Sequence, residues 1–217
     1  MRTGILITLL LAGAALIAPA QRRQAPTTPG KFDYYLLSLS WSPQYCSDMG
    51  DDPDDLQCAP GRRYGFVMHG LWPQSEDGTN PRTCSPAAKL DPQTAKSMLD
   101  IMPSNQLIIH EWGSHGTCSG MSSPDYFKLA RTAFQKIRFA PKYQSPAKDM
   151  LVKVKDFRQA FLDANPGLKP ENYALYCDDT HLREVRVCLD KNLNFRACGA
   201  RVRDACRIDA MIMRAVK

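Results

Sequence analysis

The sequence predicts an α+β fold: a single domain with a central antiparallel β-sheet, flanked by helices and held together by disulfides. Three observations lead to this prediction. Stretches typical of strands lie in the first and last thirds of the chain, and amphipathic helical stretches lie between them. The 217 residues suffice for one domain of ordinary size but hardly for two. The eight cysteines, an even number, indicate a disulfide framework formed in an oxidising compartment.

The composition is that of a globular protein with a mild positive charge. Hydrophobic residues make up 44% of the chain and charged residues 23%, which excludes a disordered chain, a collagen and a coiled coil. The formal net charge of +6 favours a polyanionic partner without specifying which one.

The N-terminus is typical of a secretory signal peptide. Arg2 precedes a short apolar run that ends in the small-x-small pattern Ala18-Pro19-Ala20. The run is shorter than the roughly 20 residues that a membrane span needs, so a signal peptide over 1–20 is expected and an anchor is not. Residues 21–30 are rich in Pro, Thr and Gln and predict a flexible leader before a folded domain over 31–217. We therefore expect a secreted or periplasmic protein that is not bound to a membrane.

The first two elements are expected to be strands. Residues 33–41 are aromatic and partly alternating, which predicts a central strand. Residues 63–72 predict a second strand that runs into a turn at Gly70. Between them, Cys46 and Cys58 bracket an acidic loop.

The middle of the chain predicts helices, and the last third predicts strands. Asp91 is suited to cap a helix that starts at Pro92 and ends before Pro103. Further helices are expected over 105–117, 123–139 and 148–164. Residues 174–203 alternate in the manner of an antiparallel meander.

The candidate catalytic residues are histidines in two short motifs that contain tryptophan. His69 lies in GFVMHGLWP (65–73), and His110 and His115 lie in HEWGSHGTC (110–118). A single histidine is more often a core residue than a catalytic one, but three of the four histidines fall in these motifs. On a helix, residues 110, 111, 114 and 115 would share a face, so His110, Glu111, Ser114 and His115 would project together. His69 could complete the cluster from a strand end.

Two kinds of chemistry fit such a cluster. A pair of histidines can remove one proton and donate another at mildly acidic pH. A metal site is the alternative, but His110 and His115 are five residues apart, whereas the zinc-binding HExxH motif places its histidines four apart. General acid–base catalysis without a metal is therefore the favoured interpretation.

The two motifs resemble the active-site segments of the ribonuclease T2 family, in HGLWPQ at 69–74 and HEWGSHGTC at 110–118. The resemblance extends over about residues 31–206 and includes SLSWSPQYC at 38–46, REVRVCLD at 183–190 and NFRAC at 194–198. It implies that 31–217 is a ribonuclease domain that needs no cofactor and no metal.

The resemblance also implies a reaction and residue roles. It implies an endoribonuclease that cleaves single-stranded RNA with low base specificity through a 2′,3′-cyclic phosphate. DNA would not be cleaved because it lacks the 2′-hydroxyl. His115 would be the general base, His69 the general acid, His110 a phosphate ligand and Glu111 a stabiliser of the phosphorane. Trp72 would stack on a substrate base. A monomer is expected.

One position departs from the family pattern. Many members carry a lysine directly before the second-motif histidine, where this chain has Ser114. Ser114 is expected to bind the substrate by donating a hydrogen bond, but it adds no positive charge near the phosphate. Either another cation, such as Arg62, Arg63 or Lys89, substitutes for the lysine, or catalysis is weakened. In the second case the fold would act mainly as a binding or toxin-like protein.

The cysteines are expected to pair completely. Eight cysteines allow 105 pairings, and short spacing favours Cys46–Cys58 and Cys188–Cys198. The resemblance implies Cys84–Cys118 and Cys177–Cys206 for the others. A zinc site built from Cys177, His181, Cys188 and Cys198 is the alternative, but its spacing is irregular.

Overall fold

The computed structural model describes residues 28–50, 55–86 and 88–216. The expected signal peptide over 1–20 and residues 21–27 of the expected leader lie outside these described residues. Within them, no helix combines the length and apolar character needed to cross a membrane.

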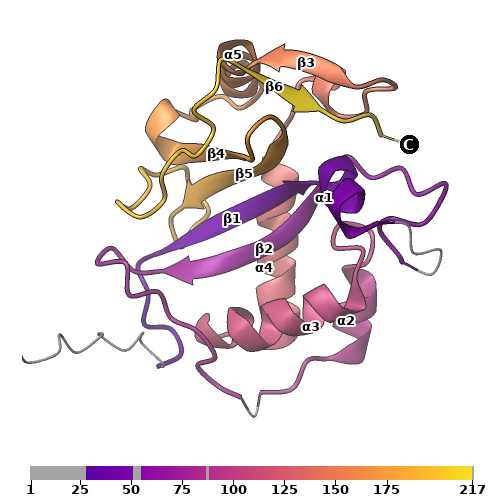
Figure 1. The fold of residues 1–217 in the computed structure, drawn as a ribbon. Coiled ribbons are helices and arrows are strands. Elements are labelled where there is room, and N and C mark those ends of the chain that lie inside the picture. Colours follow the sequence, from indigo (N-terminus) through magenta and orange to yellow (C-terminus); the bar gives the residue numbers. More distant parts are fainter. Residues whose placement is uncertain (1–27, 51–54, 87, 217) are drawn as a thin grey trace, which may run out of the picture.

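A four-stranded antiparallel sheet lies at the centre of the molecule (Figure 1). Its strand order is β2 (Phe66–Gln74), β1 (Tyr34–Trp41), β5 (Leu182–Leu189) and β4 (Tyr173–Cys177). Strand β1, which was expected to be central, is an interior strand of this sheet. Helices pack around the sheet, and the predicted α+β class is confirmed.

Five α-helices surround the sheet in the described part of the chain. They are α1 (Ser42–Met49), α2 (Pro92–Ser97), α3 (Asn105–Ser114), α4 (Ser123–Lys136) and α5 (Val154–Ala164). In Figure 1, α4 passes behind β1 and β2, and α2 and α3 lie beside it. A small second sheet pairs β3 (Met150–Lys153) with β6 (Ala210–Met213) next to α5.

One face of the central sheet packs on the main core, and the other, here called the polar face, carries polar side chains beside a small apolar cluster of Tyr34, Leu36 and Cys188. The side chains of β1 alternate, so Tyr35, Leu37, Leu39 and Trp41 enter the main core while Ser38 and Ser40 point the other way. Strand β5 repeats this pattern, since Val185 and Val187 are core residues and Glu184 and Arg186 lie on the polar face. The polar face therefore collects hydroxyl and charged groups from two adjacent strands.

The helix starts agree with the sequence better than the ends do. Asp91 caps α2 by accepting a hydrogen bond from the Thr94 backbone N–H at 2.7 Å. The helix then ends at Ser97, well before Pro103. Helix α3 ends at Ser114 and a 3₁₀ turn over Gly116–Cys118 follows, so the expected helix over 105–117 is divided in two.

Three predicted elements are wrong. Strand β2 continues through Gly70 to Gln74 without a turn. The first residues of the expected helix over 148–164 form β3, because they pair with β6 from the distant C-terminal segment. The last part of the expected meander, after β5, forms no strand, and only an isolated β-bridge joins Leu189 and Phe195.

Four disulfides use all eight cysteines. The pairs are Cys46–Cys58, Cys84–Cys118, Cys177–Cys206 and Cys188–Cys198, which agree with those expected. The alternative zinc site is therefore wrong, since its three cysteines are cross-linked. The bond between Cys84 and Cys118 joins the loop after β2 to the turn after α3.

Candidate active site

His69 is the extra residue of a β-bulge in strand β2. The register with β1 places Gly70 opposite Ser38 and Met68 opposite Leu39, which leaves His69 without a partner of its own. Met68 and Leu71, three residues apart, both reach the main core, which a regular alternating strand does not allow. A bulge re-aims the side chain that it carries. Here the bulge directs His69 to the polar face.

Gly70 is needed for the close approach of helix α3 to this strand. A β-carbon built at Gly70 would lie 2.0 Å from the Glu111 Oε2 atom and 2.3 Å from the Trp72 Nε1 atom. Both distances are too short for a contact between non-bonded atoms, so only glycine at this position leaves room for the Glu111 and Trp72 side chains. The predicted role of Gly70 in a turn is thus replaced by a role in packing.

Glu111 is a buried carboxyl group at the centre of the cluster, with an exposed fraction of 1%. Its Oε2 atom accepts a hydrogen bond of 2.7 Å from Trp72 Nε1, and its Oε1 atom lies 4.0 Å from His69 Nε2. Burial raises the pKa of Glu111 to about 7, although the charge of His69 and the Trp72 hydrogen bond oppose this increase. Below that pH the group is mostly a neutral carboxylic acid.

His115 lies directly after the last residue of α3, in the turn that leads to Cys118. Its backbone N–H donates to the Glu111 carbonyl at 3.0 Å, and its ring centroid is 5.4 Å from that of Trp72. Burial lowers the pKa of His115 to about 3, and the charges of Arg82, His110 and His69 add to this decrease. At mildly acidic pH the imidazole is therefore neutral and able to accept a proton.

His110 and Ser114 occupy the exposed side of the same helix. The Ser114 hydroxyl is 3.5 Å from His110 Nε2, and the rings of His110 and His115 are 6.4 Å apart. His69, Trp72, His110, Glu111 and His115 all line one cavity of about 380 Å³. The structure thus brings the three motif histidines together from β2, from α3 and from the turn after α3. Ser114 lies beside His110 but does not line this cavity.

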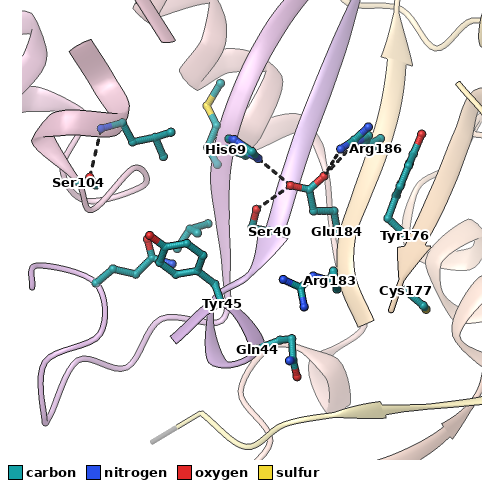
Figure 2. Close-up of a pocket in the computed structure, with 14 residues that line it drawn as sticks. Ser40, Gln44, Tyr45, His69, Ser104, Tyr176, Cys177, Arg183, Glu184 and Arg186 are labelled. Carbon is teal, nitrogen blue, oxygen red and sulfur yellow. Dashed lines mark hydrogen bonds and ion pairs between the residues drawn. The ribbon is translucent and has the colours of Figure 1, made fainter. Parts of the chain in front are cut away.

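Glu184 on β5 holds His69 and was not predicted as a site residue. Its Oε1 atom lies 2.7 Å from His69 Nδ1 (Figure 2). Ser38 and Ser40 donate hydrogen bonds to the same carboxylate at 3.1 and 3.2 Å. Arg186 contacts it from two residues along the strand, with its Nη2 atom at 2.6 Å. The alternation of REVRVCL, with valines on one face and charges on the other, was the signal that placed Glu184 on the polar face.

The charge state of this pair follows from its contacts. Burial raises the pKa of Glu184, but the His69 hydrogen bond and the Arg186 charge outweigh it and lower the pKa to about 2. Glu184 is therefore ionised and accepts the hydrogen bond, so His69 Nδ1 carries the proton. Burial lowers the pKa of His69, but the hydrogen bond and charge of Glu184 and the charge of Glu111 raise it above its usual value.

His69 also borders a second cavity, of about 430 Å³ (Figure 2). Its lining includes Tyr45, Gln44 and Gln57 from the region of α1, and Ser104 and Leu107 at the start of α3. His69, Tyr176, Glu184 and Arg186 also border it, and all of these except Glu184 line the first cavity as well. His69 thus borders two cavities, each large enough for part of a nucleotide.

The cations beside the first cavity are not the expected ones. Arg82, Arg186 and Arg201 line it, whereas Arg62, Arg63 and Lys89 do not. The arginines come from the loop after β2, from β5 and from the segment after it, so spacing around Ser114 could not identify them.

In the described part of the chain, His110, Glu111 and His115 are the one group of three or more His, Cys, Asp or Glu residues whose potential metal-ligand atoms all lie within 4.8 Å of one another. Glu111 is poorly suited to bind a metal, because one of its oxygens already accepts the Trp72 hydrogen bond and its pKa is about 7. The donor set therefore fits proton transfer better than metal binding.

Comparisons with known proteins identify relatives over most of the chain. The model of the ribonuclease T2 family matches residues 32–198. A ribonuclease of Aeromonas hydrophila is 38% identical over 182 residues, which are 81% of this chain and 81% of that protein. Ribonuclease DdI of Dictyostelium discoideum is 30% identical over 182 residues, 76% of each chain. The solved structure of trichomaglin, described as an S-like ribonuclease, has the same fold, with a TM-score of 0.71 at 21% identity over 86% of this chain and 100% of that one.

Proposed function

The chain belongs to the ribonuclease T2 family and is a ribonuclease, and from this premise we propose that it cleaves single-stranded RNA by metal-independent acid–base catalysis in two steps. The observation that carries the proposal is the convergence of His69 and His115 on one cavity, where their ring centroids lie 5.1 and 5.4 Å from that of Trp72. Burial lowers the pKa of His115 and keeps its imidazole neutral, whereas Glu184 raises the pKa of His69. A base and an acid of this kind are what the reaction requires.

In the first step, the ribose 2′-oxygen forms a bond to the adjacent phosphorus and the bond to the 5′-oxygen breaks. His115 takes the 2′-hydroxyl proton, and this role is supported by its neutral, buried imidazole. His69 gives a proton to the departing 5′-oxygen. The Glu184 carboxylate at Nδ1 supports this role, because it stabilises the imidazolium and leaves the Nε2 proton to be donated.

His110 and Glu111 act on the phosphate between these two groups. Neutral Glu111 can donate a hydrogen bond from Oε1 to a phosphoryl oxygen while Oε2 accepts from Trp72. Exposed His110 meets the phosphate from the solvent side. In the second step the roles reverse: His69 removes a proton from water, and His115 returns one to the 2′-oxygen as the cyclic phosphate opens to a 3′-phosphate.

The two cavities that His69 borders suit the bases that flank the scissile bond. Trp72, half-buried and 5.1 Å from the His69 ring centroid, offers an aromatic face in the first cavity. Stacking accepts any base, so low base specificity follows. DNA is excluded as a substrate because it has no 2′-hydroxyl to act as the nucleophile.

The chain is proposed to act outside the cytoplasm as a monomer, after removal of residues 1–20, with 21–30 as a leader and 31–217 as the catalytic domain. The small-x-small pattern at Ala18–Ala20 and the complete pairing of cysteines support this proposal. The mass of the exported protein would test it, since an N-terminus at Gln21 is expected and an intact Met1 would contradict it.

The direct test of the reaction is RNA digestion in excess EDTA. We expect the purified chain to retain its full rate and to accumulate 2′,3′-cyclic phosphate ends before 3′-phosphates, as measured by phosphorus NMR of a dinucleotide. A metal-dependent nuclease serves as the control for chelation, and the matching deoxydinucleotide should remain intact. Loss of activity in EDTA, or products with 5′-phosphates, would exclude the proposed mechanism.

Replacing Glu184 with glutamine should lower kcat/KM about 10-fold at neutral pH. The amide keeps the size of the side chain but removes the charge that raises the His69 pKa, so that pKa falls. Because His69 must be protonated in the first step, the alkaline limb of the pH–rate profile should move to lower pH. Glu171→Gln, at an exposed position outside both cavities, is the matched control. An unmoved alkaline limb would show that Glu184 does not set the acidity of His69.

A further inference from the structure

The proposed reaction concentrates negative charge on the phosphoryl oxygens, and the three histidines do not supply a permanent cation to balance it. Ser114 is uncharged, and His115 is neutral at the working pH. A guanidinium, in contrast, stays charged at every pH of interest. A permanent positive charge at this site can therefore come from the arginines that line the first cavity.

Arg186 already forms an ion pair with the Glu184 carboxylate. Its guanidinium forms the ion pair with Glu184 at 2.6 Å and stacks on Tyr176, with its carbon 3.8 Å from the ring centroid. Arg201 lies against Gly78, where a β-carbon would meet its Nε atom at 2.2 Å. Arg82 differs from Arg186 in that it forms no ion pair or hydrogen bond with any other described residue, and its side chain is exposed.

Arg82 is held at the cavity by the segment around it. On one side Pro81 is buried. On the other side, Thr83 has a positive φ of 53°, and its backbone N–H donates to the Ser114 carbonyl at 2.9 Å. The next residue is Cys84, which is bonded to Cys118 with a Cα–Cα distance of 4.8 Å. Thr83 is thus bonded to Ser114, directly before His115, and Cys84 is bonded to Cys118, three residues after it.

A left-handed conformation at a threonine is unfavourable and persists only where the surroundings enforce it. Here the hydrogen bond to Ser114 and the disulfide to Cys118 enforce it. The result is that a charged side chain is held next to the base-carrying turn, instead of moving freely on a surface loop.

The electrostatic effect of Arg82 reaches the reacting groups. Its charge lowers the pKa of His115, as the second cause after burial, and also opposes the raised pKa of Glu111. Of the guanidiniums that line the cavity, Arg82 therefore combines proximity to the catalytic pair with freedom from another carboxylate.

We propose that Arg82, fixed by the Thr83 hydrogen bond and the Cys84–Cys118 disulfide, is the catalytic cation that contacts the phosphoryl oxygens and stabilises the phosphorane. This inference rests on the proposed function. It also explains how the site can function with Ser114 beside His115, since the positive charge comes from a different loop.

Arg82→Ala should lower kcat about 10- to 100-fold, with a smaller change in KM, because the charge matters most when the phosphorane forms. Removing the charge also raises the His115 pKa, so the acid limb of the pH–rate profile should move to higher pH. Arg82→Lys should keep part of the rate. Arg62→Ala, an exposed arginine outside this cavity, should keep the wild-type rate and profile.

A second substitution separates a lost charge from a distorted loop. Ser114 lies next to His115, and its hydroxyl is 3.5 Å from His110 Nε2, so a lysine at 114 can reach the same phosphate. In the Arg82→Ala background, Ser114→Lys should restore at least half of the rate that Arg82→Ala loses. No rescue, or an unchanged rate in Arg82→Ala, would overturn the assignment of Arg82. An inactive wild type would instead overturn the proposed function.

Discussion

Replacing His115 with alanine is expected to lower RNA cleavage about 10³-fold, the scale of a lost general base. The same loss is expected for His69→Ala, because each histidine handles one of the two protons in the first step. His115 is a neutral, buried base and His69 a cation supported by Glu184, so their roles can be distinguished by changing the leaving group.

A nucleoside 3′-(4-nitrophenyl) phosphate provides this distinction. Nitrophenolate leaves without receiving a proton, so His69→Ala should cleave the ester at nearly the wild-type rate while failing on a dinucleotide. His115→Ala should fail on both substrates, since the 2′-hydroxyl must still lose its proton. The reverse pattern would exchange the assigned roles. His181→Ala, at a position outside both cavities, serves as the control.

Replacing Gly70 with alanine is expected to lower activity at least about 100-fold and to destabilise the fold by about 1–3 kcal/mol. The added methyl group would overlap the Glu111 carboxyl and the Trp72 indole, so helix α3 and strand β2 would have to separate. The bond between Glu111 and Trp72 would break, and Glu111 would move away from His69.

Gly113→Ala is the matched control, because a β-carbon at that position of α3 meets nothing within 4 Å. It should keep full activity and gain about 0.5–1 kcal/mol of stability, since alanine favours a helix over glycine. Activity and thermal denaturation of both variants are the measurements. Wild-type activity in Gly70→Ala would show that the contact between strand and helix is not needed for catalysis.

Local sequence signals predicted the elements that depend on local interactions. Strand β1 follows from a run of aromatic and apolar residues, and the start of α2 follows from the capping side chain of Asp91. The cluster of His110, Glu111 and His115 follows from spacing along one segment. Each of these depends on residues that are neighbours in the chain, so a short window contains the required information.

The features that the sequence did not predict depend on distant partners. Strand β3 exists because Met150–Lys153 meet Ala210–Met213, and an isolated window shows only the beginning of a helix. The bulge at His69 is visible only after β1 and β2 are aligned. Glu184 has the pattern of an exposed residue on a half-buried strand, and only the placement of β5 beside β1 brings it to His69.

The bridge between Cys84 and Cys118 has a consequence for a newly made chain. While the two thiols are still reduced, no covalent cross-link joins the segment that carries Arg82 to the turn that carries His115. A freshly translated copy should therefore be a poor nuclease beside the ribosomes and messengers that produced it. Full nuclease activity would arise only after the disulfide forms, so this bond would protect the RNA of the host cell from the newly made enzyme.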